Sequence, residues 1–266
     1  MELRSGVVLP GGTATEQFEL ALLAERSGWD GVFVWETGYG VEPWTLLGAI
    51  AAVTRRVRLG TVLTPLPWRR PWKLASQVAT LDQLSGGRSI LTAGLGAPVD
   101  GLPDTGEVLD RRLRAERLDE GLDLLRLLWS GGQSFHGAHY DYECAREDLA
   151  RMARPVQQRI PVWVVGAWPR PKSMRRALRC DGVLPQFDLG RAQTPADLVG
   201  VRDWLAGRGS GIDVVVQGET RPDESVAGWV AAGCTWWLET RWEMPHDSAE
   251  RLSQIRERIG GGPPES

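Results

Sequence analysis

Short apolar runs alternate with amphipathic segments along almost the whole chain. Eight runs have the length and the β-branched content of strands; they are residues 3–9, 31–35, 57–63, 89–93, 161–165, 182–186, 213–217 and 235–239. The segments between them repeat apolar residues with the period of a helix. The clearest is 111–129, which carries Leu118, Leu122 and Leu125 on one face. The pattern predicts strands and helices in strict alternation.

This alternation predicts the fold class. Strands that alternate with helices are typical of parallel sheets joined by crossover helices. Three stretches, AERSGWDGVFVWE, ALRCDGVLPQF and AAGCTWWLET, form a weak internal repeat, each leading from a helix end into a strand. Eight strands in about 250 residues favour a closed (β/α)₈ barrel over an open doubly wound sheet. We expect one α/β domain over residues 1–266, with an insertion at 130–155 between the fourth and fifth strand units and a frayed tail at 260–266.

Composition argues against several classes of protein. No run approaches the roughly 20 apolar residues of a membrane span, and the apolar core of MELRSGVVLP is too short for a signal peptide, so we expect a cytoplasmic protein without membrane association. The net charge of −3 is dispersed, which does not favour nucleic-acid binding. Cys144, Cys180 and Cys234 are widely separated and predict free thiols. With only three histidines, no metal centre is expected.

In such a barrel, functional residues gather where the strands end. Glu36 follows the second strand and Glu239 ends the eighth, so each is a candidate acid or base, with pairing to an arginine as the alternative. The segment GAWPRPKS, residues 166–173, leads from a strand into a helix. Its backbone N–H groups, with Arg170 and Lys172, predict an anion seat, although an ordinary turn is equally compatible. The histidines of SFHGAHY, in the insertion, are interpreted as loop packing.

The segment GTVLTPLPWRRP, residues 60–71, joins the third strand to the next helix. A plain connector needs only a few turn residues, whereas this one holds three prolines, two arginines and a tryptophan. Its position puts it on the functional face of the predicted barrel. AGLG, residues 93–96, lies at the end of the next strand and would allow a ligand to approach the backbone closely.

Taken together, these stretches resemble one family. LGTVLTPLPWRRPWKLASQVATLDQLSGGRSILTAGLG resembles the third-to-fourth-strand signature of the bacterial luciferase-like family of flavin and deazaflavin oxidoreductases. RLDEGLDLLRLLWSGGQSFHGAHY resembles the next helix and loop of that family, and PVWVVGAWP with CDGVLPQ resembles its fifth and sixth strands. The resemblance spans nearly the whole chain. It implies a (β/α)₈ barrel, in agreement with the strand count.

The resemblance also implies site residues. Family members often carry a non-proline cis peptide behind the tricyclic ring, which would fall within residues 61–63. The positions implied to contact the cofactor are Glu36, Thr61, Val62, Thr64, Leu95, Gly96, Gly166, Ala167, Pro169 and Arg170. The last four match the segment that holds the cofactor phosphate. Trp68 and Arg69 would border the substrate entrance, and Trp35, Trp68, Trp168 and Trp242 are expected to wall an apolar substrate site.

Two departures from the family pattern bear on the activity. Deazaflavin-dependent dehydrogenases of the family commonly have Asp-His after the second strand, where this chain has Glu36-Thr37, and their catalytic glutamate after the fourth strand is matched by Ala97. The sugar-phosphate dehydrogenase activity is therefore not expected. No catalytic residue is assigned, and the candidates are Glu36, Thr37 and Glu239.

The function favoured by the sequence is a monooxygenase that uses reduced FMN and oxygen on a small organic substrate. The alternative is a reductase or dehydrogenase that uses the deazaflavin coenzyme F-420. A third alternative is a flavin-binding protein on the same scaffold without catalysis. The resemblance further implies that a separate flavin or deazaflavin reductase could act as a partner, and that the chain could form a homodimer.

Overall fold

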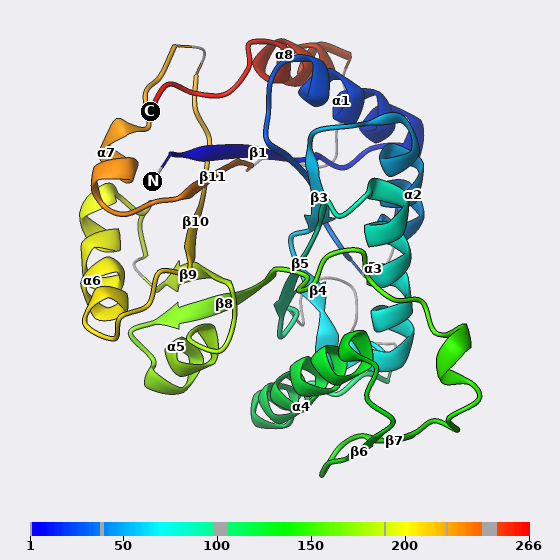
Figure 1. Ribbon diagram of the computed structural model, residues 1–266. Coiled ribbons are helices and arrows are strands. Elements are labelled where there is room, and N and C mark those ends of the chain that lie inside the picture. The colour runs from blue at the N-terminus through cyan, green and yellow to red at the C-terminus, as the bar shows by residue number, and fades with distance from the viewer. Residues whose placement is uncertain (1, 38–39, 98–105, 189, 222, 241–248) are drawn as a thin grey trace.

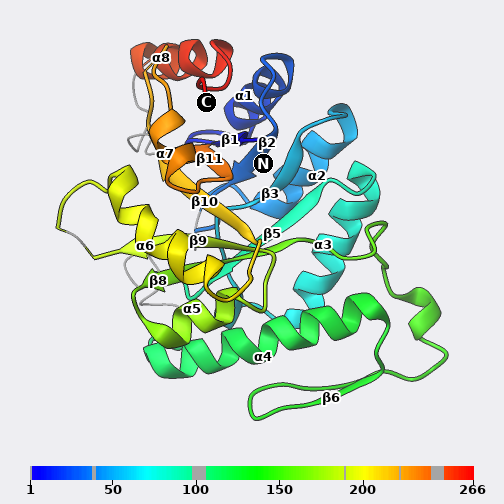
Figure 2. The same ribbon diagram turned by 60° about the vertical axis from the view of Figure 1, so that its left-hand side comes forward.

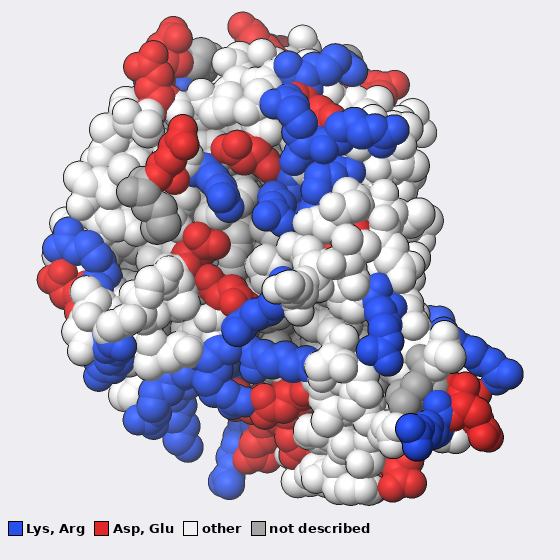
Figure 3. All heavy atoms as spheres, in the orientation of Figure 1, with Lys and Arg blue, Asp and Glu red and all other residues white. Residues whose placement is uncertain are grey.

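The computed structural model describes residues 2–37, 40–97, 106–188, 190–221, 223–240 and 249–266. Among the helices in these ranges, none combines the length and the apolar character that a membrane crossing requires. On the face shown in Figure 3, basic and acidic side chains are interspersed, as the small net charge of the chain suggests.

The described residues form a closed barrel of eight parallel strands. The strands are β1 (Arg4–Val8), β2 (Gly31–Val34), β3 (Arg58–Thr61), β5 (Ser89–Gly94), β8 (Val162–Trp168), β9 (Gly182–Phe187), β10 (Asp213–Gly218) and β11 (Trp236–Glu239). They pair in the order β3-β2-β1-β11-β10-β9-β8-β5, and the pairing of β3 with β5 closes the ring. A short strand, β4 (Thr64–Pro65), follows β3 and also pairs with β5. The predicted (β/α)₈ barrel is therefore confirmed.

Helices surround the barrel, as Figure 1 shows. They are α1 (Ala14–Arg26), α2 (Pro43–Val53), α3 (Pro71–Ser85), α4 (Arg111–Ser130), α5 (Pro171–Ala177), α6 (Pro195–Ala206), α7 (Ala227–Ala231) and α8 (Ala249–Gly260). Local sequence sets several of their ends. Thr13 and Glu16 form a capping box before α1, and α3 stops at Gly86, whose φ of +67° favours glycine. A proline in the first turn starts α2, α3, α5 and α6, where its missing N–H costs no helical hydrogen bond.

The insertion forms an antiparallel hairpin of β6 (Ser134–His136) and β7 (Asp141–Glu143), followed by a 3₁₀ turn (Leu149–Arg151). The hairpin lies outside the barrel beside α4 (Figure 2). The Glu120 carboxylate on α4 accepts the backbone N–H groups of Ala138, His139 and Tyr140 at 2.9–3.2 Å. These three bonds hold the tip of the hairpin against the helix.

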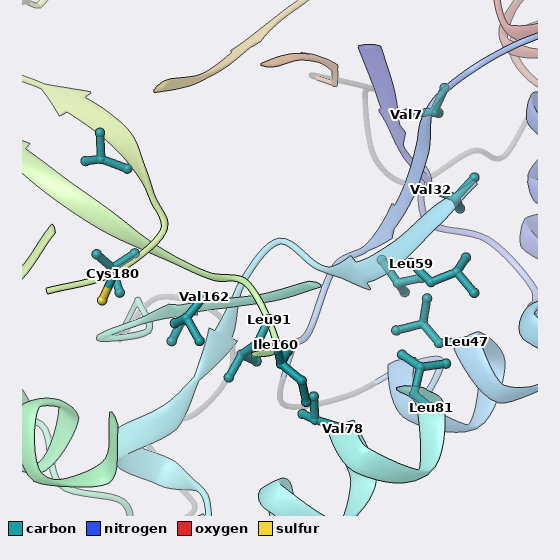
Figure 4. Close-up of a cluster of buried hydrophobic side chains, with 14 of the residues drawn as sticks. Val7, Val32, Leu47, Leu59, Val78, Leu81, Leu91, Ile160, Val162 and Cys180 are labelled. Carbon is teal, nitrogen blue, oxygen red and sulfur yellow. The ribbon is translucent and has the colours of Figure 1, made fainter. Parts of the chain in front are cut away.

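Two apolar cores lie on either side of the strands. The larger one fills the space between strands and helices, where Leu47, Leu59 and Leu81 meet (Figure 4). The smaller one lies inside the barrel and comprises Val8, Phe33, Val62, Ile90, Trp163, Leu184, Val215, Trp236 and Leu238. Trp163 and Trp236 come from the first residues of their strands, and their ring centroids are 5.1 Å apart. These rings fill the N-terminal half of the barrel, so a ligand site has to lie at the opposite end.

The C-terminal segment that the sequence predicts to be frayed makes specific contacts. The carbonyl oxygen of Glu265 accepts the N–H of Val226 at 2.8 Å, and Arg258 donates to the carbonyl oxygen of Gly262 at 2.8 Å. These bonds attach residues 261–265 to α8 and to the start of α7.

Candidate functional site

Glu36 lies where β2 ends and is the centre of a polar cluster at the barrel mouth. Its side chain is only 4% exposed. It accepts a hydrogen bond from Thr64 Oγ1 at 2.6 Å and forms an ion pair with Arg69, whose guanidinium also lies 3.6 Å from Glu42. Burial raises the pKa of Glu36, while the charge of Arg69 and the bond from Thr64 oppose that rise. The structure thus brings together the predicted residues Glu36, Thr64 and Arg69.

Thr61 and Thr64 support this cluster from beneath. Their hydroxyl oxygens are 2.8 Å apart, and both residues are fully buried. Between them, the Val62–Leu63 peptide bond is cis, which places the predicted non-proline cis bond within residues 61–63. Because the two hydroxyls are engaged with each other and with Glu36, they orient the carboxylate and are not open to a ligand in this conformation.

At the end of β5, two side chains lie over glycines. A Cβ on Gly94 would lie 2.7 Å from a methyl carbon of Leu63, so Leu63 packs directly over this backbone. Gly96 has a φ of +76°, and a Cβ there would lie 2.1 Å from the Trp68 ring. Glycine is therefore required at 96 for its conformation and for the packing of Trp68. Leu95 is half-buried and remains a candidate cofactor contact.

Arg114 is a residue of this site that the sequence reasoning missed. It lies on α4, is 5% exposed, and donates to the carbonyl oxygens of Leu95 and Gly96 at 3.2 and 2.8 Å. Its guanidinium also lies 5.3 Å from the centroid of the Trp68 ring. Arg114 fixes the loop after β5. The signal was present, since 114 precedes 118, 122 and 125 on the apolar face of the helix, where an arginine is unexpected.

The segment after β8 differs from the predicted phosphate cradle. The position that a Cβ of Gly166 would take lies 2.5 Å from Val183 and 2.9 Å from Met174, so packing against β9 and α5 accounts for this glycine. The N–H of Ala167 already donates to Ser173 Oγ at 3.0 Å. Trp168–Pro169 is a cis bond, and Arg170 is exposed beyond it. A phosphate role remains a prediction, carried by the exposed Arg170 rather than by Gly166.

Glu239, the other candidate carboxylate, points away from the barrel interior. Along β11, Trp236 and Leu238 are directed inward, so Glu239 shares the outer face with Trp237. It is fully buried and accepts bonds from Thr220 N and Oγ1, both at 2.7 Å, from Trp237 at 3.1 Å and from Arg258 at 3.2 Å. Burial raises its pKa against the effect of these partners. The arrangement fastens α8 to the barrel and leaves Glu239 outside the mouth.

The tryptophans predicted to line the substrate site differ in where they lie. Trp35 packs against the interior cluster and is half-buried, and its role as a wall of the substrate site stays a prediction. Trp168 instead packs against α6, with its ring centroid 6.5 Å from that of Trp204. Trp242 lies outside the described residues. Thr37 is exposed next to Glu36, and no catalytic role follows from its position.

Among the described residues, the side chains directed into the C-terminal half of the barrel carry no titratable group. By strand alternation, those directed into its C-terminal half are Val8, Trp35, Val62, Thr92, Val165, Leu184, Gln186, Val215, Gln217 and Leu238. Thr92 Oγ1 is buried and has no hydrogen-bond partner within the described part of the chain. Such a lining suits a planar, mostly apolar group held by a few amide and hydroxyl contacts. The Glu36 carboxylate, which follows β2, is engaged with Arg69 and Thr64.

Comparison with known proteins defines the class. The family model for luciferase-like monooxygenase matches residues 2–258, so the chain belongs to the luciferase-like family of oxidoreductases. A relative from Mycobacterium tuberculosis, described as an uncharacterized protein, is 33% identical over 223 residues, which cover 82% of this chain and 75% of the relative. A coenzyme F-420-dependent glucose-6-phosphate dehydrogenase from Nakamurella multipartita is 33% identical over 165 residues, covering 58% of this chain and 47% of that protein.

Solved structures agree with the fold. A coenzyme F-420-dependent secondary alcohol dehydrogenase, in complex with a coenzyme–acetone adduct, superposes with a TM-score of 0.76 at 18% identity, covering 98% of this chain and 99% of the other. The oxygenating constituent of 3,6-diketocamphane monooxygenase from Pseudomonas putida, in complex with FMN, gives 0.64 at 21% identity, covering 82% and 67%. At these identities the likeness establishes the barrel architecture alone.

Proposed function

We propose that the protein is an oxidoreductase that transfers hydride between coenzyme F-420 and a small organic substrate. The observation that carries the proposal is the lining of the mouth, whose described side chains are apolar or bear an amide or a hydroxyl, and include no titratable group. Hydride transfer to carbon at such a site requires little acid–base help from the protein. The proposal prefers hydride transfer to the monooxygenation that the sequence favours, and it is supported by the relative from Nakamurella multipartita, a glucose-6-phosphate dehydrogenase described as dependent on this coenzyme.

The residues present fit a tricyclic ring. Val62 and Leu63 would lie behind it, Trp35 and Val165 would border it, and the unpartnered hydroxyl of Thr92 offers a donor or acceptor below it. When bound, a deazaflavin supplies a carbon centre that accepts or donates hydride. The protein would orient the ring through these side chains.

Charged residues have secondary roles in this proposal. Arg170 and the neighbouring Lys172 are exposed after β8 and would contact the phosphate of the coenzyme. Glu36 is held by Thr64 and Arg69, so it keeps Arg69 at the rim rather than exchanging a proton with substrate. The proton that accompanies hydride transfer would come from solvent.

A reduced-FMN monooxygenase is the second candidate. The same lining favours it, because an apolar site without acids protects a reactive oxygen adduct from water. The diketocamphane enzyme has this barrel architecture and was solved with FMN.

Two assays separate the candidates. Under anaerobic conditions, purified protein with reduced coenzyme F-420 is tested against a panel of ketones, imines and enones, following the recovery of coenzyme absorbance. In parallel, reduced FMN with oxygen is tested against the same compounds, following oxygenated products. Acceptor-dependent oxidation of coenzyme F-420 supports the proposal, oxygenated product formed only with FMN replaces it with the monooxygenase, and turnover in neither assay contradicts both. Glucose 6-phosphate is the negative control, since Thr37 and Ala97 replace the histidine and glutamate of the sugar-phosphate enzymes.

A further inference from the structure

A cavity of about 360 Å³ lies on the flank of the barrel beside the mouth. It is enclosed by the loop after β4, the start of α3, the middle of α4 and the tip of the β6–β7 hairpin. Its lining includes Trp68, Arg69, Arg70, Trp72, Arg117 and Tyr140. None of the described side chains directed into the barrel interior lines it, and Trp68 and Arg69 lie between it and the rim of the mouth. A volume of this size suits a small ligand.

The cavity carries two arginines that are not engaged in ion pairs. Arg69 is paired with Glu36 and Glu42. Arg70 lies over the Trp72 ring at 5.8 Å, and Arg117 has a buried Nε without a hydrogen-bond partner; neither guanidinium forms an ion pair with any residue in the described ranges. A guanidinium that borders a cavity and has no carboxylate partner is in a favourable position to bind an anion.

The remaining charges of the lining are largely engaged with each other. His139 Nε2 lies 3.3 Å from a carboxylate oxygen of Glu116, and the Asp141 carboxylate is 2.8 Å from His136 Nδ1. Glu107 also lines the cavity. Burial raises the pKa of Tyr140; the charge of Arg117 opposes that rise, and the charges of Glu120 and Glu107 add to it. The two unpaired arginines therefore outweigh the one unpaired carboxylate.

Aromatic side chains complete the lining. Trp68, Trp72 and Tyr140 face the same cavity as the unpaired arginines. Arginine recognises a carboxylate through two parallel hydrogen bonds, and aromatic faces bind planar groups by stacking. We propose that this cavity binds a planar aromatic carboxylate, with Arg117 and Arg70 on the carboxylate and Tyr140 and Trp68 against the ring.

Calorimetric titration with benzoate, on protein without cofactor, tests the site independently of the proposed redox activity. Benzamide, which has the same shape without the charge, and inorganic phosphate, which has charge without the ring, are the matched probes. We expect saturable binding of benzoate at one site, with benzamide and phosphate at least about tenfold weaker, because each lacks one of the two kinds of contact.

Substitutions of Arg117 and Arg70 test whether these two side chains bind the carboxylate of benzoate. Arg117→Gln and Arg70→Gln should each weaken benzoate binding by about tenfold or more. Arg112→Gln is the control, because Arg112 lies on the same helix as Arg117 and 89% of its side chain is exposed. The benzoate affinity of this variant should stay within about twofold of that of the parent protein. Circular dichroism confirms that each variant folds, and having two separate arginine variants keeps the test valid if one of them does not. Absent benzoate binding, equal binding of benzamide or phosphate, or full affinity in both arginine variants would overturn the proposal.

Discussion

Two glutamates at strand ends, Glu36 after β2 and Glu239 at the end of β11, look alike in the sequence but differ in the structure. Each is paired with an arginine, and burial raises the pKa of each. Glu239 is fully buried on the outer face of its strand, and its partner Arg258 is 9% exposed. The partner of Glu36, Arg69, is 28% exposed and borders a cavity. The first pair holds a helix on the barrel, whereas the second shapes the rim of the mouth.

The difference shows that the distance of a carboxylate from the strand end does not decide its role. Its role depends on the direction of its side chain and on the exposure of its partner. A pair that is buried on both sides, such as Glu239 and Arg258, is called closed here. Such a pair contributes to stability, and losing one member leaves the other charge buried and unpaired. A pair at a rim can lose one member at lower cost, because its partner still reaches solvent.

The largest effect is expected for Glu239→Ala. The change leaves Arg258 without its carboxylate and Thr220 N without its acceptor, so the free energy of unfolding should fall by about 3–5 kcal/mol. Urea denaturation measures it. Asp203→Ala, which removes the exposed partner of Arg202, is the control and should leave the midpoint unchanged. A loss at Glu239 no larger than at Asp203 would show that the closed pair is not structural.

Glu36→Gln should have a smaller effect, a loss of about 1–2 kcal/mol in the same experiment. The amide keeps an acceptor for Thr64, and Arg69 keeps Glu42 and solvent as partners. Equal losses for the two glutamates would remove the distinction between rim and closed pair.

The pH dependence of stability sharpens the comparison. Because the folded-state pKa of Glu36 is raised above the usual 4.5, the folded protein binds this proton more tightly than the unfolded chain does. The resulting stabilisation is present below pH 4.5 and is lost as the pH rises toward the folded value. Denaturation at several pH values above 4.5 should therefore show a shallower decline for Glu36→Gln than for the parent protein. Parallel curves would contradict a raised pKa for Glu36.

The smallest effect is expected for Glu42→Gln, a change of at most about 0.5 kcal/mol. Glutamine retains the acceptor that caps α2, so only the long contact with Arg69 loses its charge. The double variant with Glu36→Gln should lose more than the sum of the two single changes, because Arg69 then has no carboxylate left. Additive losses of stability would show that Glu36 and Glu42 are not coupled through Arg69.

The fold could be predicted because alternation of strands and helices is a property of sequence periods. The ends of β1 and α4 lie within one residue of their predicted positions. The site was harder to predict than the fold. Beyond the end of a strand, the direction of a side chain depends on the local backbone conformation and not on the alternation of the strand. Gly166 has the composition of a ligand cradle but serves packing with Met174, and Trp168 faces α6 instead of the mouth. Arg114 stands out as an arginine on an apolar helix face, but its partner, the carbonyl oxygen of Gly96, lies 18 residues earlier in the chain and could not be read from the helix pattern.

The central claim is that the barrel mouth above Trp35 and Val62 seats a flavin-type ring, and a blocking substitution tests it most directly. Ala167 is half-buried and directed inward from β8, so Ala167→Trp would fill the mouth from one side. Ala138→Trp, on the exposed hairpin, adds the same ring elsewhere. Titration with coenzyme F-420, followed by fluorescence, should give one saturable site in the parent protein and in Ala138→Trp, with affinity lost by at least about a hundredfold in a folded Ala167→Trp variant. Unchanged affinity in that variant would place the cofactor outside the mouth and contradict the account.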